Sequence, residues 1–182
     1  MALVFSFRNR QKSRAVNMRL LRHVTRELLA DLLQIVEADL GFFLVSAPEM
    51  TRFNETFLHH AGSTDVITFD YAEKVGQASR LSSGPAQNNL QRDRRDACPT
   101  LLHGEIFVCM DEALSQARHF HTTWQSELVR YIVHGVLHLL GHDDQRSAAR
   151  QRMKQAENTL LRLLASKFPI RSLAAPRFKG RA

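Results

Sequence analysis

One apolar segment, residues 124–140, constrains the fold of this chain more than any other feature. Its apolar side chains fall on nearly every side of a helix, and helices of this kind are buried inside proteins. Thr122 and Gln125 have the spacing of a capping box at the start of this helix. Gly141 suits the left-handed backbone position that often ends a helix. The segment therefore predicts a central helix that other elements must surround.

The remaining periodic segments are short and alternate between strand and helix patterns. Strands are predicted at residues 4–7, 42–46, 65–71 and 101–109, and helices at residues 17–33, 48–58, 111–120 and 147–166. Asp111 is expected to cap the helix that starts beside it. Because the two kinds of element alternate within 182 residues, we expect one domain of the α/β or α+β class.

Composition changes at one internal segment and at both ends. Residues 73–100 hold few large apolar side chains, which is typical of a mobile insertion. Residues 1–14 and 158–182 hold ten of the 25 basic residues and no acidic one, so the net charge of +7 belongs to the ends. We expect a domain over residues 1–166 and a basic tail over residues 167–182. Such ends either attract phosphate-rich partners or are merely solvated.

Several classes of protein are excluded by the same sequence. No apolar run approaches the ~18 residues that cross a bilayer, and the apolar residues at the start precede the basic ones, the reverse of a secretory signal. Cys98 and Cys109 match no disulfide framework, zinc knuckle or redox pair. We therefore expect a cytoplasmic protein with no membrane partner.

The central helix and the turn after it carry a metal-ligand pattern. His134 and His138 lie at positions i and i+4, so their side chains leave the same helix face one turn apart. Two histidines in so apolar a helix need partners, because burying unpaired polar groups is costly. The turn carries His142, Asp143 and Asp144. A third ligand from this turn would complete a catalytic zinc site with an open position.

Residues next to the histidines limit the reaction. The zinc peptidase motif H-E-x-x-H places its general base directly after the first histidine, where this chain has Gly135, which argues against proteolysis. Glu127 and Tyr131 lie on the same helix stripe as His134. Glu127 is a candidate partner that orients the imidazoles, whereas ordinary helix packing is the simpler account of Tyr131.

The segment His134–Asp144, HGVLHLLGHDD, resembles the signature of the YbeY family of bacterial endoribonucleases. Further matches are Asn9-Arg10-Gln11, the segment STDVITF at residues 63–69, Gly104-Glu105-Ile106, and Glu127-Leu128-x-Arg130. The resemblance extends over residues 4–165, apart from the 73–100 insertion. It implies an α+β fold with a small mixed sheet packed by helices, and a metal site on a central helix and the turn after it.

The same resemblance implies a function. Family members are zinc-dependent endoribonucleases specific for single strands, and they act in ribosomal RNA processing, notably at the 3′ end of 16S rRNA, and in ribosome quality control. The implied partners are rRNA and the small ribosomal subunit. The implied ligands of one Zn²⁺ ion are His134, His138 and Asp144, and the two histidines would act through the metal. Asp144 replaces the usual family histidine, so His142 remains the alternative third ligand.

A second departure from the family affects catalysis. The family arginine four residues after Asn54 is Leu58 here, and leucine cannot bind phosphate. Either Arg52, His59 or His60 supplies the missing charge, or nuclease activity is weak. The alternative function is therefore an RNA-binding or ribosome-assembly factor whose metal is mainly structural. A zinc site alone would also permit hydrolysis of a substrate other than RNA.

Overall fold

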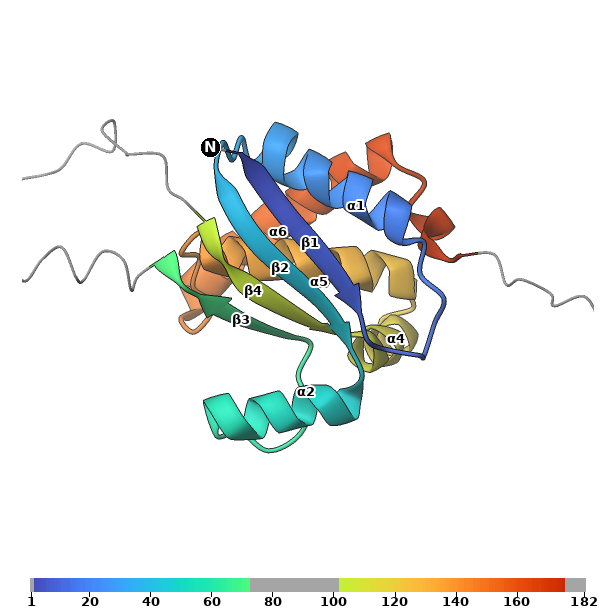
Figure 1. The fold of residues 1–182 in the computed structure, drawn as a ribbon, viewed down its shortest axis with the longest axis vertical. Coiled ribbons are helices and arrows are strands. Elements are labelled where there is room, and N and C mark those ends of the chain that lie inside the picture. Colours follow the sequence, from blue (N-terminus) through green and yellow to red (C-terminus); the bar gives the residue numbers. More distant parts are fainter. Residues whose placement is uncertain (1, 73–101, 176–182) are drawn as a thin grey trace, which may run out of the picture.

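Four strands form one mixed sheet in the computed structural model, which describes residues 2–72 and 102–175 (Figure 1). They are β1 (Leu3–Asn9), β2 (Ala38–Val45), β3 (Val66–Asp70) and β4 (Leu102–Cys109), in the order β1-β2-β4-β3. The pairs β1–β2 and β2–β4 are parallel, and β3 pairs antiparallel with β4. The predicted strands are confirmed, although β1 and β2 are both longer than their predicted ranges, because the two strands pair with each other along all of β1.

The predicted helices are also present. They are α1 (Met18–Arg26) with its π-helical continuation η1 (Glu27–Leu32), α2 (Ala47–Phe53) with η2 (Asn54–Leu58), α4 (Met110–His119), α5 (Trp124–Leu139) and α6 (Ser147–Lys167). A short 3-10 helix, η3 (Ile170–Leu173), follows α6. Together with the mixed sheet, these helices make a single α+β domain. None of the helices in the described residues has the length and apolar character needed to cross a membrane.

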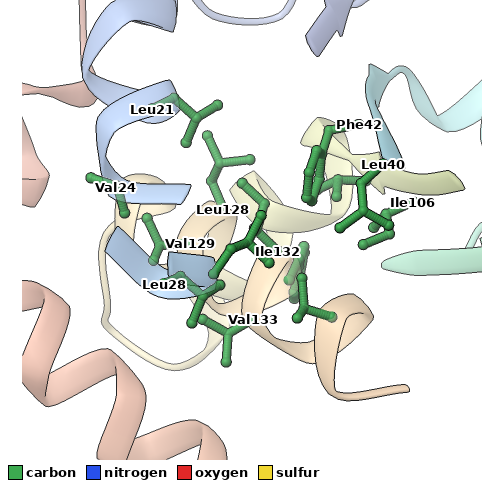
Figure 2. Close-up of a cluster of buried hydrophobic side chains, with 14 of the residues drawn as sticks. Leu21, Val24, Leu28, Leu40, Phe42, Ile106, Leu128, Val129, Ile132 and Val133 are labelled. Atoms are coloured by element: carbon green, nitrogen blue, oxygen red, sulfur yellow. The ribbon is translucent and has the colours of Figure 1, made fainter. Parts of the chain in front are cut away.

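The main core lies between α5 and one face of the sheet. Figure 2 shows Leu128 and Ile132 of α5 next to side chains of α1, β2 and β4. The apolar character of α5 on nearly every side follows from this position, since α4, α6, η3 and the strands β3 and β4 border it and α1 adds side chains to the same core. A smaller core on the other face of the sheet joins Met50 of α2 to Phe107 of β4. The predicted central helix is thus confirmed.

Gly135 allows α5 to approach the sheet closely. A Cβ atom at this position would lie 2.6 Å from Cγ2 of Ile106 and 3.2 Å from Cγ1 of Val66. These separations are too short for a side chain, because close-packed interiors tolerate little added volume. The position after the first histidine therefore faces β3 and β4, and no acidic side chain could stand there as a general base.

Two capping predictions were wrong. Thr123, not Thr122, caps α5 by accepting a hydrogen bond from the backbone N–H of Ser126 at 3.2 Å. Asp111 does not cap α4, which begins at Met110. Its carboxylate instead accepts hydrogen bonds from the Ser13 hydroxyl and from the backbone N–H of Ala47 at 2.7 Å. Asp111 thus binds distant segments that its local spacing did not reveal, whereas the Thr122 hydroxyl donates to Glu127 in the first turn of α5.

The C-terminal region also differs from the expected tail. Helix α6 extends to Lys167, and Leu173 of η3 is fully buried in the main core. The backbone of residue 174 pairs with that of Val16. Residues 167–175 therefore pack against the domain, because an apolar side chain is removed from water there. The rest of the tail, residues 176–182, and the expected insertion at 73–100 lie outside the described residues.

Candidate metal centre

His134 and His138 face each other at the C-terminal end of α5. Their Nε2 atoms are 3.0 Å apart, and each lies 3.9 Å from Oδ2 of Asp144. Gly141, with a φ of +83°, turns the chain back after the helix as predicted. The three side chains offer ligand atoms that all lie within 4.8 Å of one another, so this group could hold a metal ion.

The two candidates for the third ligand occupy different positions. Asp144 directs its carboxylate toward both histidines. His142 is exposed, and its backbone carbonyl oxygen, rather than its ring, contacts His138. Among the described residues, the structure therefore groups Asp144 with the two histidines and leaves the His142 ring outside the group.

Each imidazole has a polar partner near the nitrogen that faces away from the group. Nδ1 of His138 lies 3.1 Å from the carbonyl oxygen of His142. Nδ1 of His134 lies 3.8 Å from Oε2 of Glu157, which comes from α6 and is only 7% exposed. Partners of this kind fix the ring orientation and leave Nε2 free to bind a metal. Glu157 is a functional candidate that sequence reasoning missed, because nothing in the local pattern links it to His134.

Glu127 supports the site indirectly. Its carboxylate is buried, accepts a hydrogen bond from the Thr122 hydroxyl at 2.6 Å and pairs with Arg130 at 3.3 Å. Arg130 in turn binds Oε1 of Glu157 at 3.2 Å. Glu127 therefore reaches His134 only through Arg130 and Glu157, and its role in orienting the imidazoles stays a prediction. Tyr131 lies in the main core, as its simpler interpretation required.

The charges around the two histidines shift their pKa values in opposite directions. Burial lowers the pKa of His134, but the neighbouring carboxylates of Glu157, Asp65 and Asp144 outweigh burial, so its pKa is raised. Burial and the adjacent His134 lower the pKa of His138. Without a metal, His134 is therefore the ring that takes up a proton more readily.

The arrangement fits a tetrahedral metal ion. With metal–nitrogen bonds of about 2.0–2.1 Å, two tetrahedral nitrogen ligands lie roughly 3.3 Å apart. The two Nε2 atoms are 3.0 Å apart, slightly less than this value, and each Nε2 lies 3.9 Å from Oδ2 of Asp144, slightly more. Two imidazoles and one carboxylate form a donor set found in metallohydrolases, which leave the fourth position for water or substrate.

Comparison with known proteins identifies the family. The model of the family described as Endoribonuclease YbeY matches residues 6–165. The chain belongs to the YbeY family. The Endoribonuclease YbeY of Salinibacter ruber is 31% identical over 150 residues, which cover 76% of this chain and 85% of the relative. That of Parabacteroides distasonis is 30% identical over 126 residues, covering 69% and 71%.

A solved structure supports the fold. The solution structure of TM1509 from Thermotoga maritima aligns with a TM-score of 0.57 at 19% identity, and the alignment covers 98% of this chain and 100% of that one. At this level of identity the likeness shows a shared fold. The resemblance to the YbeY family noted from the sequence is thus confirmed by the family model and by the relatives.

Leu58, where the sequence resemblance led us to expect a departure from the family, is accessible to solvent. It ends η2 with 44% of its surface exposed. Asn54 is buried and donates a hydrogen bond to the carbonyl of Gly62 at 2.8 Å, so it ties η2 to the next loop. His59 and His60, two of the candidates to replace the missing charge, are both exposed to solvent in the turn after η2.

A cleft opens beside the candidate metal centre. It has a volume of about 500 Å³ and lies between α5 and α6. His134 and Asp144 line one part of it, together with the Arg130–Glu157 pair. The volume is within the range of pockets that hold small molecules or parts of larger ligands. The candidate metal centre is therefore accessible from a cavity large enough to admit substrate groups.

Proposed function

We propose that this protein is a zinc-dependent endoribonuclease that cleaves single-stranded RNA. Its proposed role is ribosomal RNA processing in the cytoplasm, including maturation of the 3′ end of 16S rRNA on the small ribosomal subunit, and ribosome quality control. One Zn²⁺ ion would be held by His134, His138 and Asp144. Membership of the YbeY family supports the reaction class.

One structural observation carries the proposal. Three ligand atoms converge at the edge of the α5–α6 cleft, and the side chains that bear them come from a helix and the turn directly after it. A purely structural zinc site is closed by four protein ligands, whereas three ligands leave a position open. In the described residues the group contains three such side chains. This donor set is the one expected for catalysis.

The residues of the chain have separate tasks in this proposal. Zinc bound here would act as a Lewis acid on a phosphate oxygen and would lower the pKa of a water molecule. Glu157 holds the His134 ring, and the His142 carbonyl holds the His138 ring, so that both Nε2 atoms stay directed at one point. Gly135 keeps α5 against the sheet and excludes a carboxylate from the position that peptidases use for their base.

Leu58 favours a second candidate function. An exposed leucine cannot stabilise the charge of a phosphoryl group in transfer, which the family arginine is thought to do. If no other cation replaces it, the protein would act mainly as an RNA-binding or ribosome-assembly factor with a structural metal. The two functions differ in whether RNA is cut, so a cleavage assay separates them.

The deciding experiment combines metal analysis with an RNA assay. Purified protein is expected to contain about one zinc ion per chain and to cleave a single-stranded RNA, and a chelator should abolish cleavage. RNA binding that survives the chelator, with no cleavage in either condition, would favour the assembly factor. Cleavage that continues after complete removal of zinc would contradict the proposed reaction.

A further inference from the structure

The α5–α6 cleft has a charged wall that the proposed reaction does not use. Arg150 and Lys154 lie at positions i and i+4 of α6, so they project from the same side of the helix, and both line the cleft. Both side chains are exposed. No carboxylate within residues 2–72 and 102–175 forms an ion pair with either of them. This wall therefore presents two exposed cations that form no ion pair in the described part of the chain.

The three acidic groups of the cleft make their contacts away from this wall, and Asp144 faces His134 and His138. Glu127 and Glu157 are both buried, and both pair with the guanidinium of Arg130. Arg150 donates hydrogen bonds to the backbone carbonyls of Asp144 at 2.8 Å and Gln145 at 3.3 Å, which leaves its positive charge in place. An anion that enters the cleft would thus meet Arg150 and Lys154.

An exposed aromatic ring lies at the other end of the cleft. Phe120 follows α4 and is 62% exposed, although it also lines the cleft. Figure 1 shows α4 beside the first turns of α5 and the α5–α6 turn at the opposite end of α5. The metal group lies near that turn, so the cleft runs from His134 past Glu127 toward Phe120. Cations near the scissile site and an aromatic platform farther away match the needs of single-stranded nucleic acid.

The length of the cleft sets the size of the occupant. From residue 134 to residue 127 the rise of a helix gives roughly 10 Å. At about 3.4 Å per nucleotide along a stacked strand, that distance holds about three nucleotides. The occupant is a single strand, because a base can stack on a side chain only when it is unpaired.

We propose that the α5–α6 cleft binds about three nucleotides of single-stranded RNA that flank the cleaved phosphate. Lys154 and Arg150 contact the phosphates, and Phe120 stacks on a base at the far end. This inference rests on the proposed nuclease function, because it takes the metal group as the point of cleavage. It adds a substrate path and three contacting residues to the metal ligands.

The first test removes the charge of Lys154. Binding of a fluorescently labelled single-stranded RNA of twelve nucleotides is measured by anisotropy with metal-free protein at several salt concentrations, so that no cleavage intervenes. We expect K154Q to weaken binding and to reduce the salt slope by about 0.7, the value for one phosphate contact to a single strand. The control R22Q removes the same charge from an exposed residue of α1 outside the cleft. Equal effects of K154Q and R22Q would overturn the proposal.

The second test replaces the aromatic ring. F120L keeps an apolar side chain but removes the stacking surface, so binding should weaken about tenfold, whereas F120Y should bind like the unmodified protein. The control F57L changes another exposed phenylalanine, on η2, which does not line the cleft. Thermal melts confirm that each variant is folded. Unchanged binding by F120L, or equally tight binding of a fully paired RNA duplex, would overturn the proposal.

These binding results can be separated from the fate of the nuclease function. If the unmodified protein cuts no RNA but the cleft variants bind RNA more weakly than their controls, the RNA-binding cleft is supported and the nuclease function is contradicted. If the protein cuts RNA but the cleft variants bind it like their controls, the nuclease function is supported and the RNA-binding cleft is overturned.

Discussion

Oε2 of Glu157 lies 3.8 Å from Nδ1 of His134, the ring nitrogen that faces away from His138. The carboxylate comes from α6, whereas the histidine belongs to α5. Helix α6 therefore contributes to the candidate metal centre without offering a ligand. A buried carboxylate behind a histidine ligand fixes the ring and increases its basicity.

Replacing Glu157 should weaken metal binding without removing a ligand. We expect E157Q to lower zinc affinity about 10- to 100-fold, the usual loss when a residue that orients a metal ligand is replaced. Competition with a chromophoric chelator measures this affinity. The control E127Q alters the carboxylate on the other side of Arg130, which does not touch His134. It should lower stability but change zinc affinity less, and an equal loss of affinity in both variants would contradict the role assigned to Glu157.

Removing the two imidazoles should abolish both metal binding and reaction. The variant H134A/H138A is expected to contain no zinc and to cleave no RNA, because a single carboxylate cannot hold the ion. Elemental analysis and a gel assay with single-stranded RNA check the two outcomes. RNA cleavage retained by this variant would remove the metal from the mechanism.

The third ligand can be identified by a matched pair of variants. D144A should reduce zinc affinity more than about 100-fold, beyond the effect of losing a supporting partner. H142A should leave affinity nearly unchanged, because only the backbone carbonyl of His142 contacts His138. The same chelator competition applies to both. The reverse order of affinities would show that the His142 ring, rather than Asp144, completes the site.

Zinc affinity should increase with pH. The pKa of His134 is raised, since the carboxylates of Glu157, Asp65 and Asp144 outweigh the effect of burial, whereas burial and His134 lower the pKa of His138. The proton on His134 stabilises the metal-free fold below the unfolded pKa, and this contribution is lost as pH rises through the folded pKa. Zinc must displace that proton, so its affinity should rise over the same range.

Nuclear magnetic resonance of the metal-free protein checks the order of titration. The His134 ring signals should change at a higher pH than those of His138. In E157Q the change at His134 should move to lower pH, because the carboxylate that raises the pKa of His134 most is gone. Coincident titration of both rings in the unmodified protein would contradict the electrostatic description of the site.

A methyl group at position 135 should destabilise the fold. G135A would place Cβ 2.6 Å from Cγ2 of Ile106, and such overpacking costs about 1–3 kcal/mol of unfolding free energy. Urea denaturation measures the loss. The double variant G135A/I106A relieves the contact, so its loss should be smaller than the sum of the two single losses. Strict additivity would show that Gly135 is not needed for the approach of α5 to the sheet.

Much of the metal centre could be predicted from local sequence. The spacing of His134 and His138 places both rings on one helix face whatever surrounds the helix, because 3.6 residues complete a turn. Gly141 ends the helix for an equally local reason, since a positive φ suits glycine. Asp144 lies so few residues farther along that its carboxylate returns to the same end of the helix.

Contacts between distant segments could not be predicted in this way. Glu157 and Arg130 come from separate helices, and only the packing of α6 on α5 brings them together. Asp111 has the spacing of a helix cap but binds Ala47 from α2 instead. Both outcomes depend on which elements become neighbours.

The amino-acid sequence by itself determined the elements, the central buried helix and the direction of its two imidazoles, because these depend on backbone geometry within a few residues. The tertiary structure decided which carboxylate holds His134, how the cleft is lined, and that residues near Leu173 pack on the core. Burial of apolar surface chooses how helices pack, and that choice then positions polar groups that are remote in the chain.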